Sequence, residues 1–158
     1  MSRRLREELK QTKPFESLEQ EVFLEIQRTA QVTARWVVEA LKPSGLSPSQ
    51  FNVLRILRGA GPEGLACGAV CERMVNHDPD LTRLLDRLEA VALVEKFRDA
   101  KDRRVVKARI TKAGLRAVEK ADSAVRERLA GTLRSLGPRR LEMLADLLEM
   151  ARASIRPE

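Results

Sequence analysis

The sequence has few aromatic residues and few residues in the patterns typical of catalytic sites. Its 158 residues include no tyrosine, one tryptophan, four phenylalanines and one histidine. We therefore expect one domain of ordinary size with a core of leucine, valine and alanine. Neither a glycine-rich phosphate loop nor a nucleophile at a recognisable distance from a base is present. The sequence predicts no enzyme, no catalytic residue and no cofactor.

Long apolar runs and a cysteine framework are also missing. The longest apolar runs span four or five residues, as at Val91 to Val94, whereas a membrane helix needs about 20. The charged segment from Met1 to Lys13 lacks the apolar stretch of a signal peptide. Two cysteines are too few for a disulfide scaffold. We expect a cytoplasmic protein with no membrane partner.

Basic charge is plentiful and concentrated. The net charge is +7, and eight basic residues lie between positions 96 and 112 against Asp99 and Asp102, so this segment alone contributes 8 − 2 = +6. The basic residues are Lys96, Arg98, Lys101, Arg103, Arg104, Lys107, Arg109 and Lys112. Such a run is commonly only a solvated surface. Its functional interpretation is a polyanionic partner, either nucleic acid or an anionic membrane surface.

Apolar residues at helical spacing predict a first helix over 17–41 and a short helix over 65–74. Between these segments, Ser47 and Gln50 flank Pro48 in the pattern of a capping box, which predicts a second helix start. The pair Asp78-Pro79 predicts the start of a fourth helix. Its apolar stripe consists of Leu81, Leu84, Leu85 and Leu88, and its other faces carry Thr82, Arg83, Asp86 and Arg87.

The period then changes to two, which predicts strands over 94–98 and 105–110 joined by a polar tip. Thr111 is placed to cap a long helix, and Gly137-Pro138 precedes a last helix. This order predicts a mainly α protein with a small β-hairpin, a winged helix-turn-helix. We expect a charged arm over 1–16, helical dimerisation regions over 17–45 and 112–158, and a DNA-binding region over 46–111.

The basic run lies on the hairpin, directly after the amphipathic helix. A helix of this kind enters the major groove of DNA while the tip of the hairpin reaches a minor groove. The predicted DNA-binding residues are Asp80, Thr82, Arg83, Arg87, Arg98, Lys101, Arg103 and Arg104. The alternative for Arg83 and Arg87 is an ion pair with Asp86 or Glu89.

Five segments of the chain stand out together: SPSQF (47–51), LTRLLDRLE (81–89), LVEK (93–96), DAKDRR (99–104) and ITKAG (110–114). In these segments the sequence resembles the MarR (multiple antibiotic resistance regulator) family of winged helix-turn-helix transcriptional regulators. The resemblance covers about residues 18 to 155. It implies a homodimer joined through its first and last helices and bound to double-stranded DNA at a palindromic operator. It also implies repression that is relieved by a small phenolic or oxidant signal.

The sequence departs from the family pattern in three places. Ala92 stands where the family usually has glycine, so we expect a turn that needs no positive φ. The turn over 76–80 is unusually acidic, and its carboxylates either repel phosphate or accept a hydrogen bond from cytosine N4. No cysteine precedes Cys67, which disfavours the branch that senses peroxide through its first helix. The resemblance also implies a salt bridge between Asp102 and Arg104 that braces the hairpin.

Four residues are candidates for sensing an effector. In the family, ligand pockets lie between the dimer helices and the winged lobe, where Trp36 and Phe51 are candidate lining residues. Core or dimer packing is the alternative for both. Cys67 and Cys71 lie one helical turn apart, which suits a redox pair or a metal site with His77, although an intrahelical disulfide fits poorly. Their alternative role is that of small buried hydrophobic residues, with no metal.

Two other functions remain open from the sequence. One is an architectural DNA-binding protein with little sequence specificity. The other is a protein-interaction or membrane-surface module, whose binding would follow anionic charge and would not depend on Thr82 or Arg83. Activation in place of repression is also open.

Overall fold

The computed structural model describes residues 3–76 and 80–155. Its α-helices are α1 (Arg3–Glu8), α2 (Leu18–Leu41), α3 (Pro48–Ala60), α4 (Cys67–Glu72), α5 (Leu81–Ala90), α6 (Lys112–Thr132) and α7 (Gly137–Ile155). Its strands are β1 (Leu65–Ala66), β2 (Val94–Arg98) and β3 (Val106–Ile110), and two short 3-10 helices are η1 (Lys42–Ser44) and η2 (Arg134–Leu136). The predicted mainly α fold with a small β element is confirmed.

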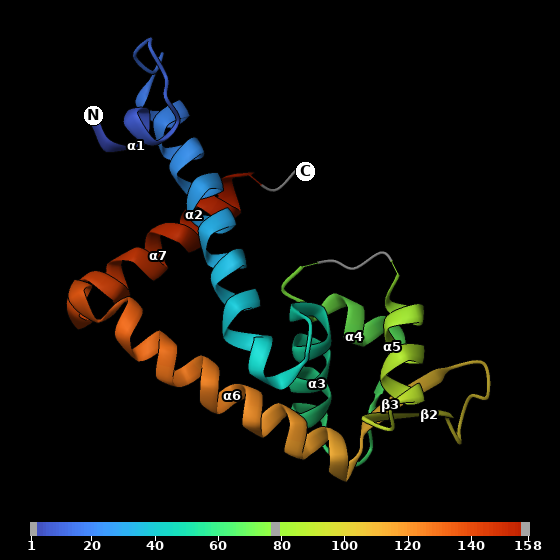
Figure 1. The fold of residues 1–158 in the computed structure, drawn as a ribbon. Helices are drawn as coiled ribbons and strands as arrows, with labels where there is room; N and C mark the ends of the chain where they lie inside the picture. The colour runs from blue at the N-terminus through green and yellow to red at the C-terminus, as the bar shows by residue number, and fades with distance from the viewer. Residues whose placement is uncertain (1–2, 77–79, 156–158) are drawn as a thin grey trace.

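The elements form a lobe and a set of long helices (Figure 1). Helices α3, α4 and α5 and the sheet make up the lobe, from which the connection between β2 and β3 projects. Helix α6 leads away from the lobe, and α7 turns back toward α2. Among residues 3–76 and 80–155, no helix is both long and apolar enough to cross a membrane.

The predicted hairpin is the larger part of a three-stranded antiparallel sheet with the order β1-β3-β2. Lys96 on β2 and Leu65 on β1 both pair with Ala108 on β3. The helix predicted over 65–74 is therefore too long, because residues 65 and 66 form a strand. Gly64 permits this pairing, since a Cβ atom there would lie 2.5 Å from the carbonyl oxygen of Ala108.

The predicted capping box is present at the start of α3. The backbone N–H of Ser47 donates to Oε1 of Gln50 at 2.9 Å, and the N–H of Gln50 donates to Oγ of Ser47 at 3.2 Å. The predicted helix start at Asp78-Pro79 lies outside the described residues. Helix α5 begins at Leu81, and Asp80 occupies its N-cap position without a side-chain capping bond.

The predicted apolar stripe of α5 is buried. Its residues join α3 and α4 in one core whose fully buried members include Leu54, Leu57, Val70, Leu85 and Leu88. The stripe fixes which side of α5 faces the lobe, because buried leucines at this spacing lie on one face of a helix. The opposite side of α5 is therefore exposed to solvent.

The segment predicted to be a charged, partly ordered arm contains a short helix. Helix α1 buries Leu5, which is 2% exposed, and Phe15 in the following segment is 4% exposed. Nε of Arg28 on α2 lies 3.5 Å from Oε2 of Glu8. The sequence pattern does not predict this packing, because two isolated apolar residues in a charged stretch do not reveal that they meet a longer helix.

Candidate nucleic-acid interface

The exposed side of α5 carries the residues predicted to read DNA. Thr82, Arg83, Asp86 and Arg87 are all exposed. The side chain of Arg83 is 76% exposed, and its Nη1 lies 3.3 Å from Oδ2 of Asp80. Arg83 thus pairs with Asp80 instead of forming the alternative ion pair with Asp86 or Glu89. The pair holds Arg83 near the start of α5.

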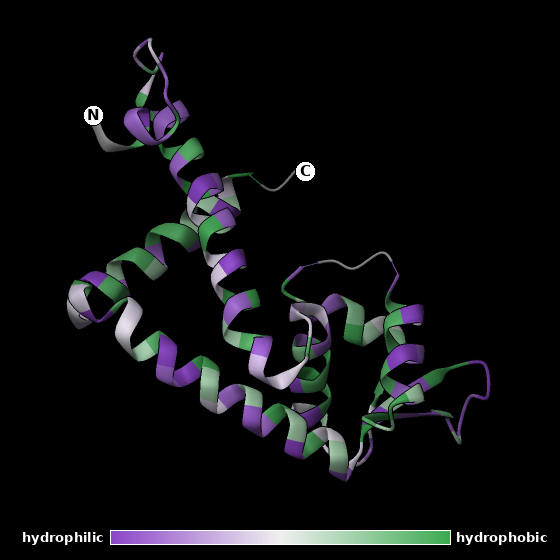
Figure 2. Ribbon diagram, in the orientation of Figure 1, coloured by the Kyte–Doolittle hydropathy of each residue, from purple (hydrophilic) through white to green (hydrophobic). Residues whose placement is uncertain are grey.

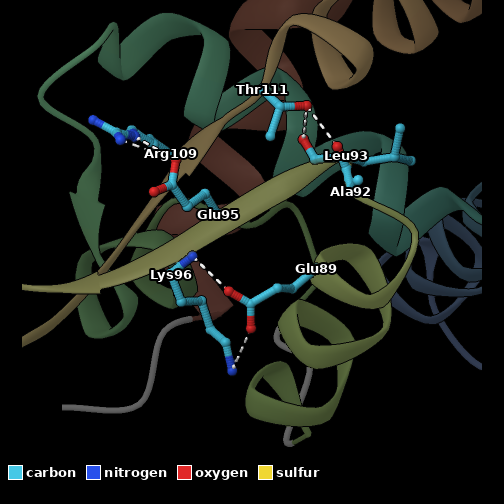
Figure 3. Close-up of polar contacts among 7 residues, drawn as sticks. All are labelled: Glu89, Ala92, Leu93, Glu95, Lys96, Arg109 and Thr111. Atoms are coloured by element: carbon cyan, nitrogen blue, oxygen red, sulfur yellow. Dashed lines mark hydrogen bonds and ion pairs between the residues drawn. The ribbon is translucent and has the colours of Figure 1, made fainter.

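Asp86 and Glu89 contact Lys96 of the neighbouring strand instead (Figure 3 shows Glu89 and Lys96). The backbone N–H of Lys96 donates to Oε1 of Glu89 at 2.8 Å, and its Nζ lies 3.3 Å from Oε2 of Glu89. The hydrogen bond with Asp86, and to a lesser degree that with Glu89, raises the pKa of Lys96 above its ordinary value. These contacts join α5 to β2, a role that the sequence did not suggest.

Two more cations of the basic run are paired within the sheet. Nζ of Lys107 lies 2.5 Å from Oδ2 of Asp99, and Nη2 of Arg109 lies 2.9 Å from Oε2 of Glu95. Within residues 3–76 and 80–155, the other five basic side chains of the run form no ion pair with an acid: Arg98, Lys101, Arg103, Arg104 and Lys112. The uncompensated charge is therefore largely at the projecting tip.

Asp99 organises this tip. Its carboxylate accepts hydrogen bonds from the backbone N–H groups of Lys101 at 2.8 Å and Asp102 at 3.0 Å. Together with the bond from Lys107, which contributes most, these bonds lower the pKa of Asp99 to about 2. Asp99 is absent from the residues predicted above to be functional. The signal that could have found it is an aspartate opening a polar turn, since aspartate commonly binds backbone N–H groups two or three residues on.

The salt bridge implied between Asp102 and Arg104 takes a different form. Oδ1 of Asp102 accepts from the backbone N–H of Arg104 at 2.9 Å, and no ion pair joins the two side chains in the part of the chain that the structure describes. The brace across the hairpin is the pair of Asp99 and Lys107. The side chain of Arg104 is exposed to solvent.

The turn between α5 and β2 corrects another expectation. Ala92 adopts a φ of +57°, although the alanine implied a turn without positive φ. Its N–H donates to the carbonyl of Glu89 at 2.8 Å, and the N–H of Leu93 donates to the carbonyl of Leu88 at 2.9 Å. This is the Schellman arrangement that ends a helix, and it requires the left-handed conformation that glycine adopts most readily. Backbone hydrogen bonding overrides the preference of alanine here.

The two predicted ligand-binding residues lie on different helices. Phe51 of α3 is 6% exposed, with the Arg55 guanidinium 5.6 Å from its ring centroid. Trp36 of α2 is partly buried, and the Arg128 guanidinium lies 5.8 Å from the centroid of its ring. A hollow of about 550 Å³ includes neither, because it is lined by Asn52, Arg55, Ile56, Arg58 and Gly59. These contacts favour packing roles, and a ligand site at Trp36 and Phe51 stays a prediction.

Neither cysteine is in a disulfide, and both are half-buried against the lobe's core. Burial is the main cause that raises the pKa of the Cys67 thiol, while the charge of Lys96 partly opposes it. Among the described residues, no three histidine, cysteine or acidic side chains are grouped as metal ligands. His77, the third ligand considered, lies outside those residues. The arrangement favours a packing role for both cysteines.

Comparison with known proteins supports the assignment made from the residues. The MarR family model matches residues 44–105. The crystal structure of a MarR transcription factor from Planctomyces limnophilus has 36% sequence identity and a TM-score of 0.65, over 87% of this chain and 99% of that chain.

One further sequence match and one further structural match concern regulators with a described role. The transcriptional repressor MdtR of Bacillus subtilis is 29% identical over 102 residues, which are 65% of this chain and 64% of that protein. The organohalide-sensing regulator RdhR, solved in a form bound to 2,4-dichlorophenol, has a TM-score of 0.77 at 19% identity, over 92% of this chain and 88% of that chain. The chain belongs to the MarR family and is a DNA-binding transcriptional regulator, not an enzyme.

Proposed function

We propose that this protein is a homodimeric repressor that binds a pseudo-palindromic operator. Helix α5 enters the major groove, and the tip between β2 and β3 enters the adjacent minor groove. The observation that carries this proposal is the projection of the tip from the lobe next to α5 (Figure 1). Four exposed cations on and beside this tip form no ion pair with an acid among the described residues: Arg98, Lys101, Arg103 and Arg104. Residues 46–111 form the DNA-binding region in this proposal.

The exposed apolar side chains of the long helices support a second copy as partner. Helix α7 has no buried residue, and its apolar side chains are exposed: Leu147 is 56% exposed and Met150 is 65% exposed. On α2, Val22 and Phe23 are each 47% exposed. Figure 2 shows apolar residues along α7, far from the lobe. Surfaces of this kind are typical of subunit interfaces, so we assign 17–45 and 112–158 to dimerisation.

Repression and release by a ligand are proposed from the relatives. MdtR is named a repressor, and RdhR senses organohalides and binds a dichlorophenol. We propose that a small phenolic or other aromatic compound binds this protein between the long helices and the lobe. Binding would change the separation of the two α5 helices, which must match half-sites about 34 Å apart.

Selection of genomic fragments by the purified protein at physiological salt tests the function. We expect one pseudo-palindromic sequence to be recovered by the wild type and lost with Arg83→Ala. Equal recovery of unrelated fragments by both proteins would support the low-specificity architectural alternative.

The role of the tip is tested by the dependence of affinity on salt. The slope of log K against log salt is negative, and each lost phosphate contact reduces its magnitude by about 0.9. We expect Lys101→Ala and Arg103→Ala each to reduce the magnitude by this amount. Lys120→Ala on the exposed face of α6 is the matched control and should leave the slope unchanged. Unchanged slopes for both tip variants would refute the assignment of the tip to DNA.

The dimer is tested by sedimentation of the wild type and the Leu147→Glu variant. We expect a dimer for the wild type and dissociation for the variant, because a carboxylate would be placed in an apolar interface. A monomeric wild type at micromolar concentration would contradict the proposal.

A further inference from the structure

Lys96 belongs to the basic run, yet its ammonium group faces α5. Nζ contacts Oδ1 of Asp86 and lies 3.3 Å from Oε2 of Glu89, while the backbone N–H of Lys96 donates to the same Glu89 carboxylate (Figure 3). Its side chain is 25% exposed, whereas that of Arg83 is 76% exposed. The ammonium is thus committed to two acids of the protein, and its exposure differs from that of a cation that projects toward solvent.

The acids that Lys96 holds lie on the helix that we assign to DNA. Within α5, Arg83 and Arg87 are balanced by Asp86 and Glu89, so the helix has no net charge without Lys96. The side chain of Asp86 is 51% exposed and that of Glu89 is 40% exposed. Carboxylates on a surface that approaches phosphates lower affinity by repulsion. Lys96 is the cation that contacts both of these acids in the described part of the chain.

We propose that Lys96 is a positioning residue that supports DNA binding through Asp86 and Glu89, without touching DNA. It neutralises two carboxylates of the recognition helix and fixes that helix to β2. The residue thereby makes α5 and the sheet a single unit for reading DNA. This inference rests on the proposed function of α5, and it assigns Lys96 a role different from that of Lys101 and Arg103.

The first test compares Lys96→Met with Lys101→Ala by fluorescence anisotropy at several salt concentrations. The methionine keeps most of the aliphatic stem and removes the charge. We expect Lys96→Met to lower operator affinity about tenfold at low salt. This loss should shrink as the salt concentration rises, because salt screens the repulsion between the exposed carboxylates and phosphate. Lys101→Ala should reduce the magnitude of the salt slope by about 0.9, because one phosphate contact is lost. An affinity of Lys96→Met equal to that of the wild type at low salt would overturn the proposal.

The second test removes the two acids in the Lys96→Met background, through Asp86→Asn and Glu89→Gln. The amides keep the shape of the side chains, and the amide oxygen at position 89 can still accept the backbone N–H of position 96 without carrying charge. We expect this triple variant to recover affinity to within about threefold of the wild type, and Lys96→Arg to retain it. A triple variant that melts like the wild type but binds as weakly as Lys96→Met would show that the acids are not the route.

Both tests use the operator and an unrelated duplex of equal length. If the wild type prefers no fragment, the proposed function fails as a statement about specificity. The comparison of the single and triple variants on the unrelated duplex still decides the role of Lys96, because phosphate repulsion does not depend on sequence.

Discussion

The hydroxyl group of Thr111 donates a hydrogen bond to the carbonyl oxygen of Ala92 at 2.7 Å (Figure 3). The same hydroxyl accepts from the N–H of Gly114 at 3.0 Å and so caps α6. The N–H of Thr111 donates to the carbonyl of Leu93 at 3.1 Å. Thr111 therefore joins the end of α5 to the start of α6, the long helix that leads to the proposed dimer interface.

Replacing Ala92 by glycine should stabilise the protein. The left-handed conformation of Ala92 costs about 1–2 kcal/mol, and glycine relieves it while adding about 0.5–1 kcal/mol of backbone entropy cost. We expect Ala92→Gly to raise the free energy of unfolding by about 0.5–1 kcal/mol. Urea denaturation at a fixed protein concentration measures this change. A decrease in stability would mean that the turn is not strained in solution.

Replacing Gly114 by alanine should destabilise the protein. A Cβ atom at this position would lie 2.2 Å from the carbonyl oxygen of Leu93 and 2.7 Å from Cγ1 of Ile110. We expect the free energy of unfolding to fall by about 2–3 kcal/mol, because the overlap forces the start of α6 away from Leu93. Gly131→Ala in the same helix is the control, because its Cβ would meet nothing within 4 Å. The control should gain up to about 1 kcal/mol, and equal effects at both sites would contradict the account.

Replacing Asp99 by alanine should loosen the tip and weaken operator binding. The carboxylate holds two backbone N–H groups and Lys107, so we expect a loss of about fivefold in affinity, with a smaller loss for Asp99→Asn. Affinity measured at one salt concentration for both variants checks this order. Equal affinity of all three proteins would show that the turn is ordered without Asp99.

The pH dependence of Asp99 follows from its lowered pKa. Because the folded pKa is about 2 and the ordinary value is 3.8, the charged form is favoured by folding. Its contribution to stability is fully present above about pH 4 and is lost as the pH falls toward 2. A carboxyl carbon NMR titration should give a midpoint near 2. A midpoint near 3.8 would mean that the contact with Lys107 is absent in solution.

Cys67 should react slowly with alkylating reagents. Its raised pKa keeps the thiol protonated at neutral pH, and the thiolate is the reactive form. In a Cys71→Ser variant, we expect iodoacetamide to modify Cys67 more slowly than free cysteine at about pH 7.5. Operator binding measured before and after treatment completes the test. Faster modification accompanied by loss of operator binding would support the thiol as a sensor.

Local patterns in the sequence predict most of the fold. The capping pair of Ser47 and Gln50 and the leucine stripe of α5 act within one or two helical turns, so short-range spacing reveals them. The strand at Leu65 escapes such patterns because its partner, Ala108, lies far along the chain. Likewise, Leu5 and Phe15 become recognisable as core residues only once they have packed in the folded chain.

The sequence by itself determined the winged helix-turn-helix architecture, the family and the segment that carries the positive charge. It did so because helix periodicity, capping and charge clustering are properties of neighbouring residues. Only the tertiary structure decided which of those charges is available to a partner. Lys96, Lys107 and Arg109 are paired with acids on α5, on the tip or on the adjacent strand, whereas Lys101 and Arg103 project at the tip. Ion pairing depends on distances of a few ångströms between segments, and these distances exist only after folding.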